Sequence, residues 1–248
     1  MFSLAQFKSV FKVRDSKGQP YILIGGQAVN FWATRYLSVE PEMAAWLPFT
    51  SADIDFKGTR RDAEHIAQQL GLHKILPPIM AITALAGAIP LTVDGAPGNI
   101  EIVRLIPGVS DREAEEHAVE REFEGETIRV LDPISLLYAK ARLALLVSQK
   151  ERRDVDHVKI LIYCVRAFLR EALDAAEHDS TLVRGWLGAT EKTLALTEST
   201  TGARLTRRFA VNWPEILPFK EIRKSPLPKV IQFRQKRLPT WEQKLSPK

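Results

Sequence analysis

The sequence predicts an α+β fold, in which a mixed sheet with flanking helices is followed by a helical C-terminal region. Apolar runs with strand character alternate with helical periodicity in the first half of the chain, whereas the second half shows helical periodicity alone. The chain has 248 residues, of which 45% are hydrophobic and 26% charged. This composition excludes a disordered or fibrous chain. We expect a strand-containing domain over residues 1–131, a helical domain over 132–210 and a basic, proline-rich tail over 211–248.

The N-terminal elements follow from apolar spacing and turn residues. Apolar residues at helical spacing predict a short amphipathic helix over residues 4–13. The apolar run Tyr21-Ile22-Leu23-Ile24 predicts a buried strand, and Gly25-Gly26 closes it before a helix that reaches about Leu37. Residues 40–50 contain two prolines and are expected to form a loop or insertion.

The next elements are a strand, a helix and a hairpin. Alternation with period two predicts a strand over residues 52–56, and an apolar stripe predicts a helix over 60–70. The turn residues of segment 94–98 predict a hairpin that joins strands over 89–93 and 99–105.

The pattern changes to helix at Asp132-Pro133, after two more candidate strands. Gly125 separates these strands, which cover residues 118–123 and 127–131. Asp132 before Pro133 places an N-cap residue before the residue type preferred at the first helical position. The predicted helices that follow cover residues 134–147, a stretch that begins near Asp154, and much of 182–209.

Residues 75–93 form an uncharged, apolar stretch that is about as long as a membrane span. Pro77, Pro78 and Pro90 interrupt helical hydrogen bonding within it. We therefore expect a buried strand-and-turn segment inside the fold, and no association with a membrane.

The basic charge of the chain is concentrated at its C-terminal end. Residues 204–248 hold twelve Lys and Arg against three Asp and Glu, a net charge of +9, whereas residues 1–203 carry −4. Prolines and aromatic residues accompany these cations, so we expect an extended arm that docks through its aromatic side chains. Such an arm is either a solvated wrap on the surface or an electrostatic footprint for RNA, DNA or another acidic partner.

Cysteine usage and the N-terminus predict a cytoplasmic protein. The single cysteine, Cys164, excludes an internal disulfide framework and suits a reducing compartment, where we expect this thiol to be buried and inert. The N-terminal residues mix lysines among apolar residues and show no pattern of a signal peptide. The five histidines are scattered, which argues against a histidine metal site or a catalytic triad.

Three acidic residues on predicted strands form the candidate chemical site. Asp53 and Asp55 are two residues apart on a strand, so they project from one face at ~6.6 Å along the backbone. Carboxylates this close repel unless a cation lies between them, and Mg²⁺ prefers oxygen ligands. Glu101 is the best third carboxylate if its strand lies beside the first. The alternative is a set of solvated acids on an exposed sheet face.

Gly25-Gly26 is a second candidate feature, because it joins a buried strand to a helix. Such a turn lets the backbone approach a phosphate group while the helix N–H groups point at the anion. A tight turn without a ligand is the alternative.

Together, Ile24-Gly25-Gly26, the segment Thr50-Ser51-Ala52-Asp53-Ile54-Asp55-Phe56 and the segment Ile100-Glu101-Ile102 resemble the three motifs of the polymerase-beta-like nucleotidyltransferase superfamily. The resemblance implies that Gly25 and Gly26 contact nucleotide phosphates of an NTP substrate. It also implies that Asp53, Asp55 and Glu101 bind two Mg²⁺ ions, and that residues 1–131 form the catalytic domain.

A narrower resemblance connects the chain to the AbiEii-like toxin nucleotidyltransferases. It depends on Ser51, Lys140 and the segment Arg152-Arg153-Asp154-Val155-Asp156. It implies that Lys140 contacts the nucleotide and that Asp154 supports the active site, although a solvated lysine and a helix cap would explain both residues as well. Phe49-Thr50 departs from this branch, where an arginine often precedes the serine. An insertion at residues 40–48 accounts for the long interval between Gly26 and Asp53.

The implied reaction transfers an NMP from an NTP to an acceptor hydroxyl and releases pyrophosphate. The basic tail favours RNA such as a tRNA as the acceptor, while a protein side chain and a small molecule stay open. The toxin branch also implies a cognate antitoxin protein as a partner. The alternative is a non-catalytic protein with the same fold that binds nucleic acid, or wraps a protein partner, through its basic tail.

Overall fold

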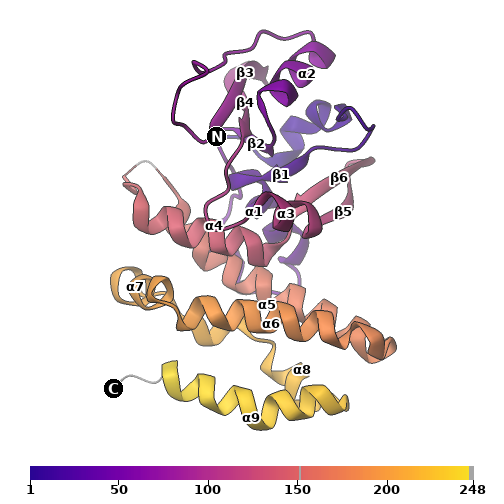
Figure 1. Cartoon of the computed structure of the whole chain (residues 1–248), viewed down its shortest axis with the longest axis vertical. Helices are drawn as coiled ribbons and strands as arrows, with labels where there is room; N and C mark the ends of the chain where they lie inside the picture. The colour runs from indigo at the N-terminus through magenta and orange to yellow at the C-terminus, as the bar shows by residue number, and fades with distance from the viewer. Residues whose placement is uncertain (151, 246–248) are drawn as a thin grey trace. The chain divides into compact units, whose positions relative to one another are not determined.

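A six-stranded mixed sheet, with the strand order β3-β4-β2-β1-β6-β5, organises the first half of the chain (Figure 1). In this computed structural model, residues 1–150 and 152–245 are described. The central pair, β1 with β2, and the two outer hairpins are antiparallel, whereas β2 with β4 and β1 with β6 are parallel. The strands are β1 (Ile22–Ile24), β2 (Ile54–Lys57), β3 (Leu85–Val93), β4 (Ala96–Val103), β5 (Ala118–Phe123) and β6 (Glu126–Leu131).

Helices flank this sheet and make up the second half of the chain, so the predicted α+β fold is confirmed. The α-helices are α1 (Gly25–Tyr36), α2 (Arg60–Leu70), α3 (Asp111–Glu116), α4 (Pro133–Leu146), α5 (Asp154–His178), α6 (Val183–Glu198), α7 (Thr200–Phe209), α8 (Phe219–Lys224) and α9 (Pro228–Leu245). The 3₁₀ helices are η1 (Leu4–Lys12), η2 (Pro41–Trp46), η3 (Ser180–Leu182) and η4 (Trp213–Ile216).

The chain divides into two compact units. The first, here called the strand unit, comprises Met1–Arg35 and Trp46–Ala139, and the second, the helical unit, comprises Tyr36–Ala45 and Lys140–Lys248. The division at residue 139 falls within α4, whereas the sequence pattern placed a boundary before this helix. The short segment 36–45 belongs to the helical unit although it lies between α1 and β2 in the sequence.

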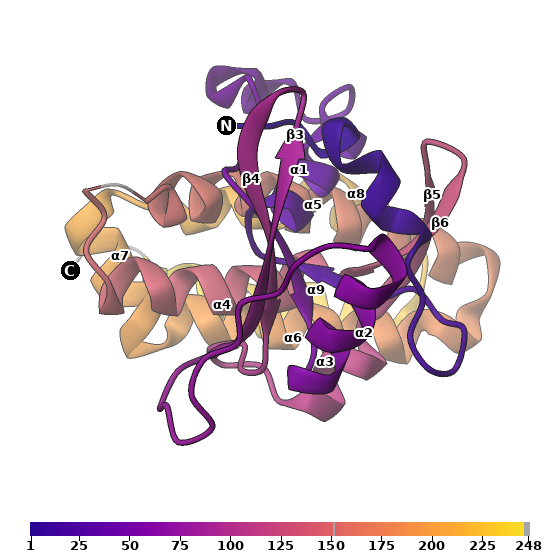
Figure 2. The same cartoon turned by 90° about the horizontal axis from the view of Figure 1, so that it is seen from above.

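The core of the strand unit follows from strand alternation. Ile54 and Phe56 on β2, with Ile100 and Ile102 on β4, are buried on one face of the sheet, and the residues between them are half-buried on the other. β3 pairs with β4 as an antiparallel hairpin and forms the edge of the sheet, and this hairpin was predicted from its turn residues (Figure 2). The predicted cap of α4 is also present, since Asp132 Oδ1 accepts hydrogen bonds from the backbone N–H groups of Ile134 and Ser135.

The expectation that residues 75–93 are buried is wrong for the first half of this stretch. Only its second half forms β3, while Ile79, Met80 and Ile82 are 83%, 89% and 106% exposed. Pro77 and Pro78 lack the N–H donor that a strand needs, so the chain leaves the sheet there after one bridge between Ile75 and Ala88. Within residues 1–150 and 152–245, no helix is long and apolar enough to cross a membrane.

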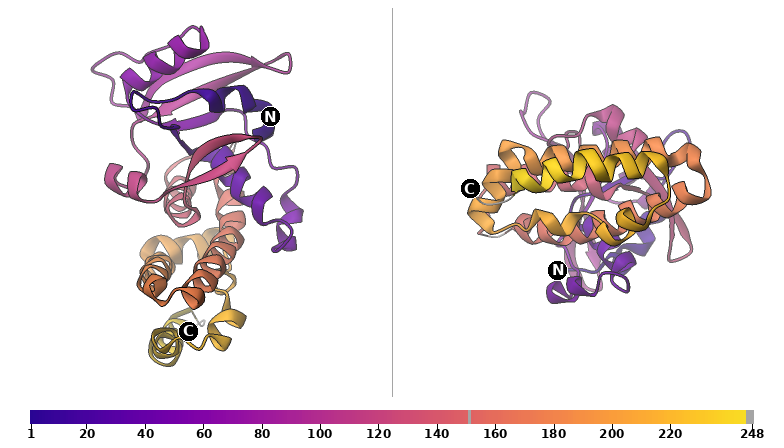
Figure 3. Two further views of the ribbon diagram at one scale, coloured as in Figure 1. Left: turned by 90° about the vertical axis from the view of Figure 1, so that its right-hand side faces the viewer. Right: turned by 90° about the horizontal axis from the view of Figure 1, so that it is seen from below.

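In the helical unit, α5 packs against α6, and α6 packs against both α7 and α9 (Figure 3). Three buried tryptophans hold these helices together, and the indole N–H of each has an acceptor, as buried indoles require. Trp186 donates to the Leu169 carbonyl at 3.0 Å, Trp213 to the Gly202 carbonyl at 3.1 Å and Trp241 to Thr197 Oγ1 at 2.7 Å.

The expectation of an extended C-terminal arm is wrong, because residues 213–245 form η4, α8 and α9. Three of the prolines stand at helix starts, since Pro214 lies in the first turn of η4, Pro218 caps α8 and Pro228 begins α9. Pro226 lies between α8 and α9, and Pro239 lies inside α9. Docking through aromatic side chains is confirmed for Trp213, Phe233 and Trp241, which are buried. Pro247 and Lys248 lie outside the described residues.

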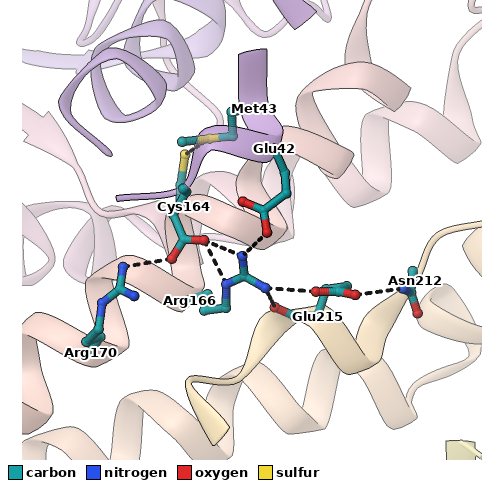
Figure 4. Close-up of polar contacts among 8 residues, drawn as sticks. Glu42, Met43, Cys164, Arg166, Arg170, Asn212 and Glu215 are labelled. Carbon is teal, nitrogen blue, oxygen red and sulfur yellow. Dashed lines mark hydrogen bonds and ion pairs between the residues drawn. The ribbon is translucent and has the colours of Figure 1, made fainter. Parts of the chain in front are cut away.

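A buried carboxylate holds segment 36–45 within the helical unit (Figure 4). Glu40 is 1% exposed and accepts hydrogen bonds from the guanidinium groups of Arg166 and Arg170, both on α5. Arg166 also contacts Glu42 and the Glu215 carboxylate, the latter at 2.8 Å. A charge this deeply buried is tolerated only when opposite charges and donors satisfy it.

Replacing Glu40 with Gln is expected to lower the free energy of unfolding by about 3 kcal/mol, because it leaves two partly buried guanidinium groups without their carboxylate. Urea unfolding followed by tryptophan fluorescence measures this change. The matched substitution Glu42→Gln removes a half-exposed carboxylate, so it should cost less than ~1 kcal/mol. Equal losses in the two variants would contradict a special role for the buried carboxylate.

Candidate active site

The turn between β1 and α1 requires glycine at position 25 for two reasons. Its φ angle is +68°, in the region that side chains disfavour. In addition, a Cβ atom at this position would lie 1.9 Å from Asp55 Oδ2 and 2.6 Å from Asp55 Cγ. The Asp55 carboxylate therefore lies directly against the backbone of the Gly25-Gly26 turn.

Asp55 and Glu101 occupy neighbouring positions on one face of the sheet. They are paired in the parallel register of β2 and β4, and Asp55 is also paired with Ile24, the last residue of β1. Residues paired directly across neighbouring strands project from the same face, with strands ~4.8 Å apart. Both side chains are half-buried, on the face opposite the apolar core. The structure thus brings together the glycine turn and two of the three predicted carboxylates.

Asp53 lies just before β2 and is held by Asn99, a residue that the sequence motifs did not include. Asp53 Oδ1 accepts a hydrogen bond of 3.1 Å from Asn99 Nδ2. Asn99 precedes Glu101 by two residues on β4, so both project from one face. The same alternation that singled out Glu101 could have identified Asn99 as a polar neighbour on this face.

Ser51 enters the site region through its backbone. It forms two main-chain hydrogen bonds with Phe2, of 2.8 and 2.9 Å, and the Phe2 carbonyl also accepts from Gln27 Nε2 at 3.0 Å. Gln27 is fully buried at the start of α1, next to the glycine turn. Phe2 therefore bridges the segment before Asp53 and the start of α1, which sequence patterns did not indicate.

Lys140 and Asp154 lie in the helical unit, where they form a buried ion pair. Lys140 Nζ donates to Asp154 Oδ1 at 2.9 Å, and Arg152 Nε donates to Oδ2 at 2.6 Å. Burial by itself would raise the pKa of Asp154, but the two neighbouring cations outweigh it and lower this pKa to about 2. The pKa of His157 is lowered too, in this case by burial and by the positive charge of Lys140.

The donor chemistry on the acid-bearing sheet face fits a hard cation. Asp55 and Glu101 carry carboxylate groups at neighbouring positions of the sheet. Asp53 precedes Asp55 by two residues in the chain. Among residues 1–150 and 152–245, no three or more His, Cys, Asp or Glu side chains form a group that could hold a metal ion, so the candidate set is the Asp55–Glu101 pair. Mg²⁺ in proteins is held by one or two carboxylates together with substrate phosphates and water, so this set suits it.

Replacing Gly25 with Ala is expected to destabilise the protein by about 3 kcal/mol, from backbone strain together with the clash against the Asp55 carboxylate. Gly18→Ala is the matched control, since Gly18 has a φ angle of +78° but no atom within 4 Å of an added Cβ. This control should cost only the strain of about 1–2 kcal/mol. Denaturant unfolding of both variants measures the difference, and identical values would contradict the close approach of Asp55.

The ion pair of Asp154 predicts a pH dependence of stability. Because its folded-state pKa is depressed to about 2, its contribution is fully present above the unfolded value near 4 and is lost as the pH falls toward 2. The difference in unfolding free energy between the wild type and Asp154→Asn should therefore shrink by about 2 kcal/mol over this range. Urea unfolding at a series of pH values measures it, and a constant difference would contradict the ion pair.

Comparisons with known proteins find distant structural neighbours but no family. A scan against protein-family models finds no match, and a search of curated proteins finds no relative. Among solved structures, an antigenic nucleotidyltransferase-like protein from Paracoccidioides brasiliensis matches with a TM-score of 0.42 and 16% sequence identity. The match covers 66% of this chain and 77% of that protein. A distant structural neighbour is thus nucleotidyltransferase-like, and similarity at this level carries no inference about activity.

Proposed function

We propose that the chain is a Mg²⁺-dependent nucleotidyltransferase, which transfers an NMP from an NTP to an acceptor hydroxyl. In this reaction the acceptor oxygen forms a bond to the α-phosphorus, the bond from that phosphorus to the leaving pyrophosphate breaks, and the hydroxyl proton is released. The supporting observation is the Asp55 carboxylate, which lies against the Gly25 backbone and shares a sheet face with Glu101. A phosphate-binding turn and a carboxylate pair at one place are what this chemistry requires.

Asp53, Asp55 and Glu101 are the residues that would hold Mg²⁺, with two ions implied by the resemblance to polymerase-beta-like enzymes. Bound there, the metal would neutralise charge on the triphosphate and lower the pKa of the acceptor hydroxyl. Asn99 would orient Asp53 through its hydrogen bond, leaving the second carboxylate oxygen for a ligand.

The glycine turn would orient the triphosphate. Backbone N–H groups at the start of α1 have no partner inside the helix, and the helix dipole places partial positive charge there. Gly25 is half-buried and carries no side chain, so a phosphate could approach the backbone there, whereas Gly26 is buried behind it. Fixed donors of this kind stabilise developing negative charge without reorganisation during the reaction.

The nucleotide-contact roles of Lys140 and Asp154 depend on the AbiEii-like resemblance, as do a toxin role and a cognate antitoxin partner. We propose that Asp154 orients Lys140 for a nucleotide contact through the hydrogen bond between them. RNA is the proposed acceptor, because the C-terminal helices carry a large excess of cations.

Incubation with each NTP labelled at the α-phosphate, Mg²⁺ and total RNA tests this proposal. The wild type is expected to transfer label to RNA, and Asp55→Asn is expected to reduce the rate by more than ~100-fold, because it removes a carboxylate from the metal-binding face. Asp174→Asn removes the same charge from an exposed position on α5 and should leave the rate unchanged. Chelation of Mg²⁺ should abolish transfer by every variant.

If no transfer is detected, thermal unfolding at a series of Mg²⁺ concentrations distinguishes two causes, which are the lack of a suitable acceptor and the lack of a metal site. A cation that binds only the folded protein stabilises it by about 2.7 kcal/mol at a hundredfold excess over its dissociation constant. This stabilisation should occur in the wild type and be lost in Glu101→Gln. Transfer that survives Asp55→Asn, or Mg²⁺ stabilisation that survives both substitutions, would refute the proposed site.

A further inference from the structure

Some cations of the C-terminal helices form ion pairs with carboxylates, and others do not. Arg237 forms ion pairs with Glu191 and Glu198, at 2.9 and 2.8 Å, and Lys244 lies 3.3 Å from Glu198. These two cations are therefore neutralised within the helical unit. Among the described residues, eight other cations of segment 204–245 are exposed and make no ion pair with a carboxylate: Arg204, Arg207, Arg208, Lys220, Arg223, Lys224, Lys229 and Lys236.

Half of these cations gather where α8 leads into α9. Lys220, Arg223 and Lys224 are exposed at helical spacings of three and four residues on α8, so they are neighbours on its surface. Lys229 follows at the start of α9, and Arg234 joins the group because its guanidinium donates to the Arg223 carbonyl. We call Lys220, Arg223, Lys224, Lys229 and Arg234 the basic corner.

The basic corner is fixed in place by the packing beneath it. Ile222 and Val230 are fully buried under α8 and α9, and the two helices pack against each other. The guanidinium of Arg223 also lies over the ring of Phe219, 5.9 Å from its centroid. Cations held on a folded surface lose less side-chain entropy on binding than cations on a flexible arm.

We infer that the basic corner binds the phosphate backbone of a nucleic acid, for which single-stranded RNA is the probe. Clustered, unpaired cations on one surface are the electrostatic footprint of a phosphodiester chain, and Arg and Lys neutralise its phosphates. A membrane surface fits less well, because membrane-binding surfaces combine cations with exposed apolar side chains. None of the large apolar residues between 183 and 245 that the structure describes is exposed.

Fluorescence anisotropy with labelled oligonucleotides of about 20 nucleotides tests this inference in the absence of NTP and Mg²⁺. The triple variant Lys220→Ala, Arg223→Ala, Lys224→Ala removes three cations from the basic corner. The matched triple variant Arg204→Ala, Arg207→Ala, Arg208→Ala removes three exposed cations from α7. Both proteins lose the same net charge, so they differ only in where the charge was.

The corner variant is expected to bind single-stranded RNA at least about tenfold more weakly than the wild type, and its slope of log affinity against log salt should fall by about 2. The α7 variant removes three cations at the same spacing but without neighbours such as Lys229 and Arg234, so it should weaken binding clearly less than the corner variant does. Equal weakening by both variants, or no binding by the wild type, would overturn the assignment. A parallel series with single-stranded DNA identifies which sugar the binding prefers, since both polymers present the same phosphates.

A second variant guards against loss of folding. Lys220→Glu, Lys224→Glu keeps Arg223, its stacking on Phe219 and its contact with Arg234, so the packing of α8 on α9 is preserved. It should unfold within ~0.5 kcal/mol of the wild type and bind RNA more weakly still. Unchanged RNA binding by this folded variant would also overturn the inference. Because no step of the assay involves transfer, failure of the proposed reaction would leave the result interpretable.

Discussion

The contact between the Gly25 backbone and the Asp55 carboxylate is the constraint on which the centre of the sheet depends. It requires the observed antiparallel register of β1 and β2, because a shift of one residue would turn Asp55 to the apolar face. The parallel register of β2 and β4 then places Glu101 beside Asp55. One glycine therefore determines the relation of the turn to two carboxylates on two different strands. No other residue type combines a φ angle of +68° with room for a carboxylate at this distance.

The connection from the turn to the acidic segment passes through the other unit. After α1 the chain contributes residues 36–45 to the helical unit, where Glu40 is buried between two arginines of α5 and Tyr36 donates a hydrogen bond of 2.7 Å to Glu171. This excursion gives a physical reason for the long interval between Gly26 and Asp53. The inserted residues carry a buried carboxylate whose partners lie more than a hundred positions later, which no local pattern reveals.

Patterns with a short period predicted the sheet and most of the candidate site, whereas features that depend on tertiary packing were missed. Alternation along two strands indicated Asp55 and Glu101, and the strand-glycine-helix pattern indicated Gly25. The prediction that residues 75–84 are buried was wrong, because apolar composition alone does not supply a partner strand and because Pro77 and Pro78 prevent strand pairing. The C-terminal helices were missed because their prolines read as an extended arm, although three of them stand at helix starts. The packing of these helices depends on Trp213 and Trp241, whose indole N–H groups donate to residues on α7 and α6.

The two proposed binding activities, nucleotide binding at the carboxylates and RNA binding at the basic corner, depend on residues of opposite charge. A face with adjacent carboxylates repels phosphate unless a cation is present, so nucleotide binding there should depend on Mg²⁺. The basic corner needs no metal, and its attraction for phosphate falls steeply with salt. Metal dependence and salt dependence should therefore belong to separate sets of residues. Asp55→Asn should abolish the first while retaining the second, whereas the corner variants should weaken RNA binding and leave Mg²⁺ stabilisation intact, because they leave the acid-bearing strands unchanged.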